Sequence, residues 1–451
     1  MTEGLFPRAF IKREQTNLGE QWPAFEAAHM LPAPVSVRVN PAKSKIAPAI
    51  HRVPWSMYGF YLDNRPSFTL DPTFHGGRYY VQEASSMFLE QALAQLTDST
   101  SSLTVLDVCA APGGKSTHLL SLIGKNSLLV SNEVIPSRAA ILSENIQKWG
   151  HGNVVVTNND PKDFQRLPGF FDVILIDAPC SGEGLFRKDP NALREWSEEV
   201  VSFCSRRQRR ILNDIWPALK TGGLMIYSTC TYSADENEEN LKWLSRQYQV
   251  EPLALNVEHE WGVQTIEDES MSGYRFSPHR VKGEGFFLSA FRKLDQPPEH
   301  DLHSKTRIQA PGKKITDEIQ QWVLKPEEKS FILHNDQVRL LPEKRMPELQ
   351  SIVKNLRIML AGTAMATIKH EKLIPEHAFA LSVDINRDAF QVIALDQAQA
   401  IDYLRKDVLN LDLSKRGFAL VSFDDVALGW VNILENRINN LYPSDWRIRM
   451  R

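Results

Sequence analysis

The chain has 451 residues, of which 42% are hydrophobic and 24% are charged, with a formal net charge of -3. These values are ordinary for globular proteins and exclude a disordered or collagen-like chain, and the length predicts about two to four domains. Since no apolar run of about 18 residues and no signal-peptide pattern at the start are found, we expect a cytoplasmic protein with no membrane partner.

The first 95 residues contain several prolines and the strand-like run SVRVN (36–40). We expect residues 1–95 to form a small α+β domain. The 52 basic and 55 acidic residues nearly balance, which is not typical of a nucleic-acid binder. Any polyanion that binds this protein must therefore bind at local basic patches.

Between residues 103 and 293, short β-branched or aliphatic runs alternate with amphipathic stretches. This alternation is typical of a parallel sheet flanked by helices, and we place an α/β domain at residues 96–294. The predicted strands are 103–108, 127–132, 153–157, 172–177, 223–229 and 285–291, the last of them a hairpin partner. The predicted helices are 115–123, 136–149, 196–219 and 234–247. Gly222 and Gly223 are expected to end the third helix after Lys220.

Residues 295–314 mix proline, glycine and charge without periodicity, and we expect a linker there. The part of the chain that follows is predicted to be a β-rich extension. It divides into an intermediate α+β region (315–405) and a terminal region (406–451). The strand-like runs on which this prediction depends are 331–342, 379–385, 417–423 and 429–434.

The stretch LDVCAAPGGKS (106–116) leads from a buried strand into a Gly-Gly turn that opens a helix. Its glycine spacing differs from that of dinucleotide-binding and P-loop motifs. Glu133, Asp160 and Asp177 follow the ends of the second, third and fourth strands, so they should converge on one ligand. A carboxylate after the second strand suits a ribose diol and one after the third suits an adenine amino group, which together describe S-adenosylmethionine. The simpler interpretation, that each acid caps a helix, stays open.

Four cysteines occur in the chain: Cys109, Cys180, Cys204 and Cys230. They are too few and too far apart for a disulfide scaffold or a paired CxxC zinc site, and we expect no metal site. A lone cysteine is most often a small buried hydrophobic residue, which is our expectation for Cys109 and Cys204. Cys180 and Cys230 follow the fourth and fifth strands, so both thiols are expected at the rim of the same crevice.

Two thiols beside a bound methyl donor suit methylation at C5 of a pyrimidine. This carbon is a poor nucleophile, so an enzyme must first add a thiolate to C6, which makes C5 electron-rich enough to attack a sulfonium methyl group. The covalent intermediate divides one difficult step into two. The C5 proton must then leave and the thiol must be expelled, for which a second thiol or a carboxylate is useful.

Several segments together resemble the Nop/Sun family of RNA cytosine-C5 methyltransferases, which use S-adenosylmethionine. They are DVCAAPGGKS (107–116), DAPCSGEG (177–184), RRQRRIL (206–212), LKTGGLMIYSTCTYSADENE (219–238) and GEGFFLSAF (283–291). RVNP (38–41) and YYVQEASSM (79–87) resemble the stretches that precede the catalytic domain in that family. The resemblance implies an α/β fold with a Rossmann-like, seven-stranded, S-adenosylmethionine-dependent methyltransferase core behind an N-terminal RNA-binding domain.

The resemblance also implies roles for individual residues. Cys230 matches the nucleophile, and Cys180 matches the second cysteine, which assists product release. Asp177 would steady the cytosine ring, and Lys115 would contact the target base or polarise the thiol pair. DNA cytosine methyltransferases use instead the cysteine of a Pro-Cys motif, here Cys180, but DAPCSG and STCTY occur together in the RNA family. The implied cofactor site comprises Cys109, Ala110, Ala111, Pro112, Gly113, Gly114, Lys115, Glu133, Asp160 and Asp177.

Residues 417–449 resemble the small β-barrel RNA-binding domain called PUA, as it occurs in F-type methyltransferases of small-subunit (16S) ribosomal RNA. We therefore expect residues 406–451 to be a PUA-like RNA-binding region that ends the β-rich extension. The arginines of RRQRRIL lie on one predicted helix and cannot all face one way, so one or two would meet RNA. The candidate phosphate contacts are Arg206, Arg207, Arg209, Arg210, Arg437, Arg447, Arg449 and Arg451.

The leading hypothesis is an enzyme that makes 5-methylcytosine in ribosomal RNA, acting as a monomer on ribosomal RNA or on the small ribosomal subunit. A transfer RNA substrate is the nearest alternative, because the same catalytic core serves both. The intact Cys180 and Cys230 argue against a non-catalytic ribosome assembly factor, and the glycine spacing argues against a Rossmann oxidoreductase. The sequence leaves open which cytosine is modified.

Overall fold

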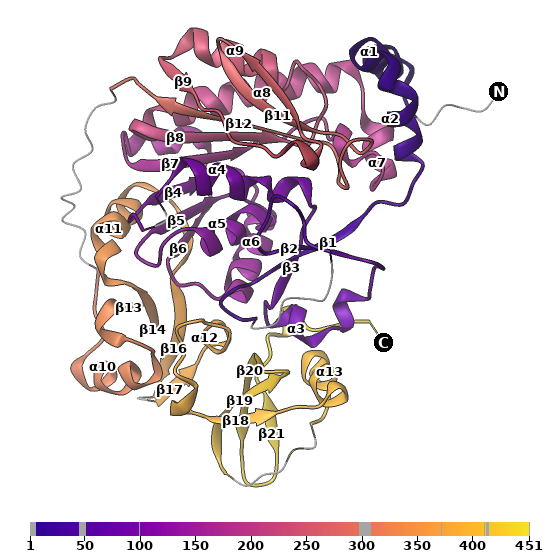
Figure 1. Cartoon of the computed structure of the whole chain (residues 1–451). Coiled ribbons are helices and arrows are strands. Elements are labelled where there is room, and N and C mark those ends of the chain that lie inside the picture. Colours follow the sequence, from indigo (N-terminus) through magenta and orange to yellow (C-terminus); the bar gives the residue numbers. More distant parts are fainter. Residues whose placement is uncertain are drawn as a thin grey trace.

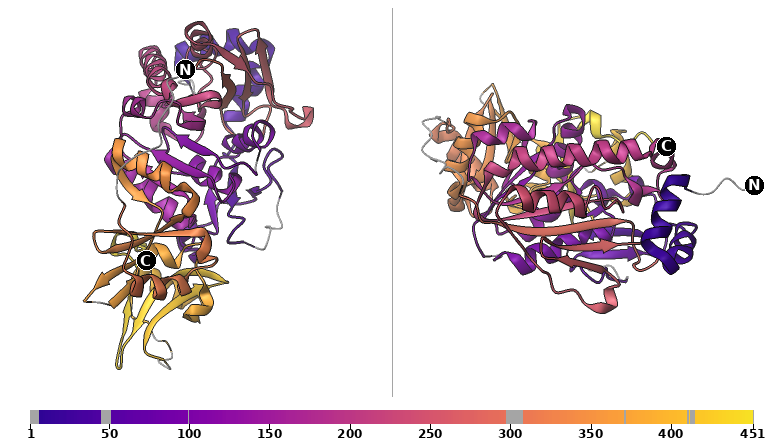
Figure 2. Two further views of the ribbon diagram at one scale, coloured as in Figure 1. Left: turned by 90° about the vertical axis from the view of Figure 1, so that its left-hand side faces the viewer. Right: turned by 90° about the horizontal axis from the view of Figure 1, so that it is seen from above.

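The computed structural model describes residues 6–44, 51–98, 100–296, 308–370, 372–409, 411 and 415–450. The strands form four sheets, of three, ten, four and four strands. Figure 1 shows the large sheet and its helices above the two small C-terminal sheets, and the left view of Figure 2 shows the same arrangement from the side. Within the described residues, no helix is long and apolar enough to cross a membrane.

The N-terminal part consists of two helices followed by a small antiparallel sheet with strand order β2-β1-β3. The predicted strand 36–40 is confirmed as β1. The helix α3 begins after Asp71, whose side chain accepts a hydrogen bond from the Thr73 amide and so caps the helix. The elements are α1 (Arg8–Leu18), α2 (Trp22–His29), β1 (Val35–Val39), β2 (Gly59–Leu62), α3 (Pro72–His75), β3 (Tyr79–Val81) and α4 (Leu89–Leu96).

The central sheet has the order β10-β11-β12-β8-β7-β4-β5-β6-β15, with β9 paired to β12. The strands from β4 to β8 are parallel to one another, and β12 is antiparallel to both of its neighbours β8 and β11. Strand order reverses between β4 and β7, the place where open α/β sheets bind ligands. The expected Rossmann-like core is thus confirmed. Its seven strands have the order β11-β12-β8-β7-β4-β5-β6, and β9, β10 and β15 extend the sheet to ten strands.

Each predicted strand and helix of this part is present, and the structure adds four elements that were not predicted, namely α7, β9, β10 and β11. The elements are β4 (Thr104–Asp107), α5 (Gly114–Leu122), β5 (Leu128–Asn132), α6 (Pro136–Trp149), β6 (Val154–Thr157), β7 (Phe171–Asp177), α7 (Pro190–Glu195), α8 (Glu198–Ile215), β8 (Leu219–Thr229), α9 (Glu238–Gln247), β9 (Val250–Pro252), β10 (Gln264–Asp268), β11 (Met271–Phe276) and β12 (Phe286–Lys293).

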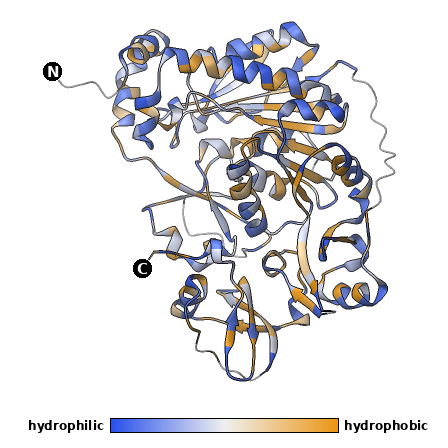
Figure 3. Cartoon of the chain, turned by 180° about the vertical axis from the view of Figure 1, so that it is seen from behind, coloured by the Kyte–Doolittle hydropathy of each residue, from blue (hydrophilic) through white to orange (hydrophobic). Residues whose placement is uncertain are grey.

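Each face of the sheet packs against its own layer of helices. In β4, Val105 belongs to the core cluster under α4, α5 and α6, whereas the next residue, Leu106, belongs to the cluster under α8 and α9. This alternation follows from the two-residue period of a strand. Figure 3 shows that the central strands are the most hydrophobic part, while the covering helices carry both hydrophobic and hydrophilic segments.

The glycine stop predicted for the long helix is wrong. The helix α8 ends at Ile215, a single 3-10 turn covers residues 216–218, and β8 already begins at Leu219. Pro217 explains the early stop, since proline lacks the N–H group that an α-helix interior needs. Gly222 lies inside β8 with φ of 73°, so the glycine pair bends a strand.

The C-terminal extension contributes one strand to the central sheet, because β15 pairs antiparallel with β6. The prediction of a strand at 379–385 is wrong, because the helix α12 covers the start of this segment. The apolar residue Phe379 is buried in the helix, where it stacks on Trp430 at a ring-centroid distance of 6.5 Å. The elements are α10 (Lys313–Ile319), β13 (Lys329–His334), β14 (Gln337–Pro342), α11 (Met346–Asn355), β15 (Ile358–Ala361), β16 (Thr363–Lys369), β17 (Lys372–Pro375), α12 (His377–Ala380), β18 (Gln391–Ala394), α13 (Gln397–Arg405), β19 (Gly417–Phe423), β20 (Val426–Ile433) and β21 (Ile438–Asn440).

Most of the expected linker, residues 297–307, lies outside the described residues, as does Arg451. The end of the expected linker is helical, since α10 begins at Lys313. The last sheet has the order β18-β19-β20-β21, and only its β18–β19 pair is parallel. The extension is β-rich, as expected.

Candidate functional site

A cavity of about 350 Å³ lies at the carboxyl ends of the parallel strands, next to the point where strand order reverses. Its lining includes residues that follow each of β4, β5, β6, β7 and β8. Of the residues predicted for the site, seven line this cavity: Cys109, Ala111, Glu133, Asp160, Asp177, Cys180 and Cys230. The structure therefore brings both proposed catalytic thiols and all three strand-end acids together.

The glycine turn forms one wall of this cavity. Gly113 has φ of 117°, a conformation that favours glycine, and α5 begins at the next residue. Two side chains of α6 hold the turn from outside: Arg138 donates to the Ala111 carbonyl at 2.9 Å, and Asn145 donates to the Pro112 carbonyl at 2.8 Å. Ala110, Pro112, Gly113, Gly114 and Lys115 do not line the cavity.

The RVNP segment supports the turn from behind through Arg38, whose side chain is fully buried. The Arg38 guanidinium donates to Thr117 Oγ1 at 2.6 Å and to the Gly114 carbonyl at 3.2 Å, and it lies 4.4 Å from the centre of the Trp149 ring. Burial lowers its pKa to about 9. A buried arginine with these partners fixes the N-terminal sheet to the first turn of α5.

Two of the acids have partners that fix their orientation. Glu133 is buried, accepts from the Ile135 amide at 3.0 Å, and lies 3.4 Å from the Arg138 guanidinium. Asp160 caps the turn after β6 by accepting from the Lys162 amide at 3.1 Å, so the capping interpretation holds for this residue. Burial opposes ionisation of Asp160, but Arg210 and the Lys162 amide outweigh it, and its pKa lies below the usual value.

Lys115 and Asp177 form an ion pair of 2.8 Å beside the cavity. The Ser228 hydroxyl donates to the other oxygen of Asp177 at 2.8 Å, and the Lys115 ammonium lies 5.2 Å from the Phe286 ring centre. Burial works against the charge on Lys115, but the Asp177 carboxylate outweighs it and raises the pKa of the lysine. Lys115 does not line the cavity itself, so its contact with the site is the ion pair with Asp177.

The two thiols are in direct contact. The sulfur atoms of Cys180 and Cys230 lie 3.1 Å apart, and the Cys230 amide lies 3.4 Å from Cys180 Sγ. The hydrogen bond with Cys230, burial, and the negative charge of Glu236 all raise the pKa of Cys180. Cys180 is thus held in its protonated form beside the second sulfur.

A buried carboxylate links the two cysteine loops, and sequence reasoning did not single it out. Glu236 accepts from the Ser181 amide (2.9 Å) and hydroxyl (2.5 Å), from the Thr231 hydroxyl (3.2 Å) and from Gln208 Nε2 (3.0 Å). Burial raises its pKa to about 7. Its sequence signal was weak, because Glu236 stands among the other acids of SADENEE, and only the fold shows which of them are buried and which one contacts the cysteine loops.

The N-terminal helices cover the loops that carry the cysteines. An aromatic cluster joins α1 and α2 to residues that follow each cysteine motif: Phe6, Phe10, Trp22, Phe25, Phe186, Trp196 and Tyr232. Arg187 adds polar contacts, since it donates to the Ala28 carbonyl at 3.1 Å and pairs with Glu284 at 3.0 Å. This packing fixes both loops from the side opposite the sheet.

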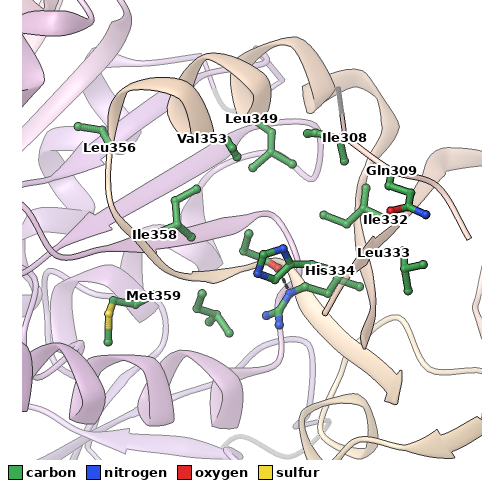
Figure 4. Close-up of a pocket in the computed structure, with 13 residues that line it drawn as sticks. Ile308, Gln309, Ile332, Leu333, His334, Leu349, Val353, Leu356, Ile358 and Met359 are labelled. Atoms are coloured by element: carbon green, nitrogen blue, oxygen red, sulfur yellow. Dashed lines mark hydrogen bonds between the residues drawn. The ribbon is translucent and has the colours of Figure 1, made fainter. Parts of the chain in front are cut away.

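The remaining cysteines and a second cavity carry no comparable chemistry. Cys204 is buried on α8, and burial raises the pKa of Cys109. The second cavity, about 490 Å³, lies between α11, β13 and β15. Figure 4 shows that most labelled side chains around it are aliphatic, and no thiol or carboxylate is among the described residues that line it.

Three family profiles match the chain in succession. The N-terminal domain of 16S rRNA methyltransferase RsmF matches residues 6–84, 16S rRNA methyltransferase RsmB/F matches residues 94–292, and the methyltransferase RsmF PUA domain matches residues 390–448. The second of these spans the cavity and both cysteines.

Solved structures share the fold of about two thirds of the chain. A methyltransferase homologue from Pyrococcus horikoshii is 30% identical, with a TM-score of 0.55, and the match covers 64% of this chain and 96% of that one. NSun6 from the same organism, solved with SFG, is 20% identical with a TM-score of 0.54, and the match covers 65% of this chain and 100% of that one.

Similar curated proteins extend over nearly the whole chain. The ribosomal RNA small subunit methyltransferase F of Shewanella loihica is 31% identical over 91% of this chain and 88% of that protein. The protein of the same name from Vibrio cholerae serotype O1 is 32% identical over 93% of both chains. The chain therefore belongs to the family of ribosomal RNA small subunit methyltransferase F.

Proposed function

We propose that this protein methylates C5 of a cytosine in small-subunit (16S) ribosomal RNA, with S-adenosylmethionine as methyl donor. The observation that carries the proposal is the pair of thiols 3.1 Å apart at a cavity that also contains three strand-end carboxylates. Relatives similar along nearly the whole chain are named for small-subunit ribosomal RNA, which supports the choice of substrate. The expected cytoplasmic location and monomeric state belong to the same proposal.

The residues around the cavity fit S-adenosylmethionine. Glu133 would accept from the ribose hydroxyls and Asp160 from the adenine amino group, while the turn from Cys109 to Lys115 would lie along the methionine portion. The buried Asp107, behind this turn, accepts from the Ser116 hydroxyl at 2.7 Å, and its other oxygen has no partner among the described residues. When bound, the cofactor supplies an electrophilic methyl group.

Cys230 would form the covalent intermediate. After losing its proton, its sulfur adds to C6 of the cytosine, and the electron pair of the C5–C6 double bond becomes available at C5 to take the methyl group. Asp177, held by Lys115 and Ser228, would hydrogen-bond the ring and steady its developing charge.

Cys180 would assist release of the product. The electron pair of the C5–H bond re-forms the C5–C6 double bond as the bond from C6 to Cys230 sulfur breaks. Cys180, in contact with that sulfur and held protonated, can donate its proton to the leaving sulfur, and its thiolate can accept the proton from C5. The overall products are then 5-methylcytosine, the demethylated cofactor and the one proton that Cys230 released at the start.

A covalent trap tests these roles. RNA that contains 5-fluorocytosine cannot lose its C5 substituent, so wild-type enzyme and Cys180→Ala should form an adduct that survives denaturing electrophoresis. Cys230→Ala should form none, and the buried Cys204→Ala serves as the matched control that keeps the adduct. An adduct in Cys230→Ala together with its loss in Cys180→Ala would reverse the two assignments.

The substrate is tested separately. Bisulfite sequencing of total RNA from a deletion strain should show the loss of 5-methylcytosine at one or more positions of the small-subunit ribosomal RNA. Loss confined to transfer RNA would favour the alternative substrate, and no loss would favour a non-catalytic assembly factor. The domain limits proposed from the sequence assign RNA binding to residues 1–95 and 406–451, on either side of the catalytic domain (96–294).

A further inference from the structure

The helix α8 carries four arginines, and the contacts of the chain separate one of them from the rest. Three of the four donate to oxygen atoms elsewhere in the protein: Arg206 to Ser202, Arg209 to Asn240, and Arg210 to Asp160 and Asp214. Arg207 is exposed, and within the described part of the chain it has no hydrogen bond, ion pair or ring contact. It also lines the cavity that contains both thiols. Arg207 is therefore an uncommitted cation at the reaction site.

An exposed aromatic ring lies next to this cation. Phe203 has 58% of its surface exposed and stands four residues before Arg207, so the two share a face of α8. Because α8 leads from β7 back to the parallel strand β8, its N-terminal turns lie at the carboxyl ends of the strands. Arg210 is held by Asp160 at the carboxyl ends of the strands. Phe203 stands seven residues earlier on α8, so the rise of the helix places it about 10 Å farther from the sheet along the helix axis. Phe203 thus lies outside the mouth of the cavity.

We propose that Arg207 binds the phosphate of the target nucleotide and that Phe203 stacks on the base of a neighbouring unpaired nucleotide. The inference rests on the proposed function, in which the cytosine must leave its stack to reach a thiol. Single-stranded RNA is bound by this combination of a cation for the backbone and an aromatic face for a base. The exposed Leu185 also lines the cavity and adds apolar surface to it.

The position of Arg207 favours RNA over the cofactor. Arg210, one turn deeper along α8, is occupied by Asp160, the acid proposed for the adenine. Arg207 lies between that pair and the outer surface, where the RNA must enter. A phosphate contact at this place contributes affinity and orientation without selecting a base sequence.

The test uses the full-length enzyme, a labelled oligocytidine RNA as probe, and the variants Arg207→Ala, Phe203→Ala and Phe203→Leu. Arg207→Ala should weaken RNA binding roughly tenfold and reduce the slope of log affinity against log salt by about 0.7, the value for one phosphate of a single strand. Phe203→Ala and Phe203→Leu should each weaken RNA binding about 5- to 100-fold with an unchanged salt slope, because leucine retains apolar bulk but cannot stack. Arg246→Ala, which removes an exposed arginine of α9, is the matched control and should leave RNA affinity unchanged.

Calorimetry with S-adenosylmethionine separates the possible outcomes. The proposal predicts an unchanged Kd for the cofactor in all variants, and unchanged Tm values. If Arg207→Ala weakened cofactor binding and left RNA affinity intact, the arginine would belong to the cofactor site and the proposal would be overturned. Wild-type RNA affinity in both Arg207→Ala and Phe203→Ala would overturn it as well. A wild-type enzyme that binds RNA by these residues but makes no 5-methylcytosine would instead refute the proposed function.

Discussion

The buried carboxyl group of Glu236 should make stability depend on pH in a calculable direction. Burial is the largest effect on this group and raises its pKa to about 7 in the folded protein, against an ordinary value of 4.5. Between these two values the folded state binds the proton more tightly than the unfolded state, so the free energy of unfolding falls as the pH rises. At about 1.4 kcal/mol for each pH unit, the loss by pH 8 is roughly 3 kcal/mol.

Glu236→Gln removes this charge and keeps the shape of the side chain. One carboxylate oxygen accepts from the Ser181 amide and from Gln208 Nε2, neither of which can accept in return, so the new amide oxygen should take this position. The amide nitrogen then faces the hydroxyls of Ser181 and Thr231, which can accept. We expect variant and wild type to unfold at similar temperatures at pH 5, and the variant to have the higher Tm at pH 8.

Scanning calorimetry at both pH values measures the effect, with Asp235→Asn as control, because Asp235 is the exposed acid next to Glu236 in the chain. Glu236→Ala provides the opposite comparison. It leaves two buried N–H groups without an acceptor, at about 1–3 kcal/mol each, and should destabilise the protein at every pH. The reasoning is refuted if Glu236→Gln lowers the Tm more at pH 8 than at pH 5, since the hydrogen bonds to the carboxylate would then outweigh its burial.

Three further substitutions test the supports of the site. Arg38→Leu should lower the free energy of unfolding by about 3–5 kcal/mol in urea, because it removes a fully buried cation and leaves its acceptors unpaired; a loss under 1 kcal/mol would contradict this. Lys115→Met should slow adduct formation in single-turnover experiments about 100-fold, because Asp177 loses its ion pair, and an unchanged rate would remove Lys115 from the mechanism. Glu133→Gln should weaken S-adenosylmethionine binding roughly 10- to 100-fold by calorimetry and leave RNA affinity unchanged, whereas equal cofactor affinity would exclude a ribose contact.

The gathering of the site residues could be predicted because it depends on topology alone. Alternating strands and helices predict a parallel sheet, and the carboxyl ends of parallel strands share one edge. Glu133, Asp160 and Asp177 were located at those ends from the sequence, as were Cys180 and Cys230, and all five line one cavity. Their shared location could be predicted without knowing how the side chains pack.

The supports of the site could not be predicted in the same way. Glu236 accepts from Gln208 and Ser181, which lie 28 and 55 residues away in the chain. Arg38 contacts Thr117 across 79 residues. No local pattern indicates such partners. The wrong prediction for the end of α8 has a different cause. Both proline and glycine can end a helix, and Pro217 comes earlier in the chain than Gly222 and Gly223.

The same distant contacts also act on Cys180. Cys180 and Cys230 are chemically identical side chains 50 residues apart, and a motif can assign their roles only by resemblance. In the fold, Glu236 anchors the residue after each of the two cysteines. Its negative charge acts together with Cys230 and burial to raise the pKa of the Cys180 thiol. A protonated thiol is a poor nucleophile but a suitable proton donor. The raised pKa of Cys180 therefore suits the proton-donating role proposed for it, and Glu236 is the residue through which that pKa can be altered.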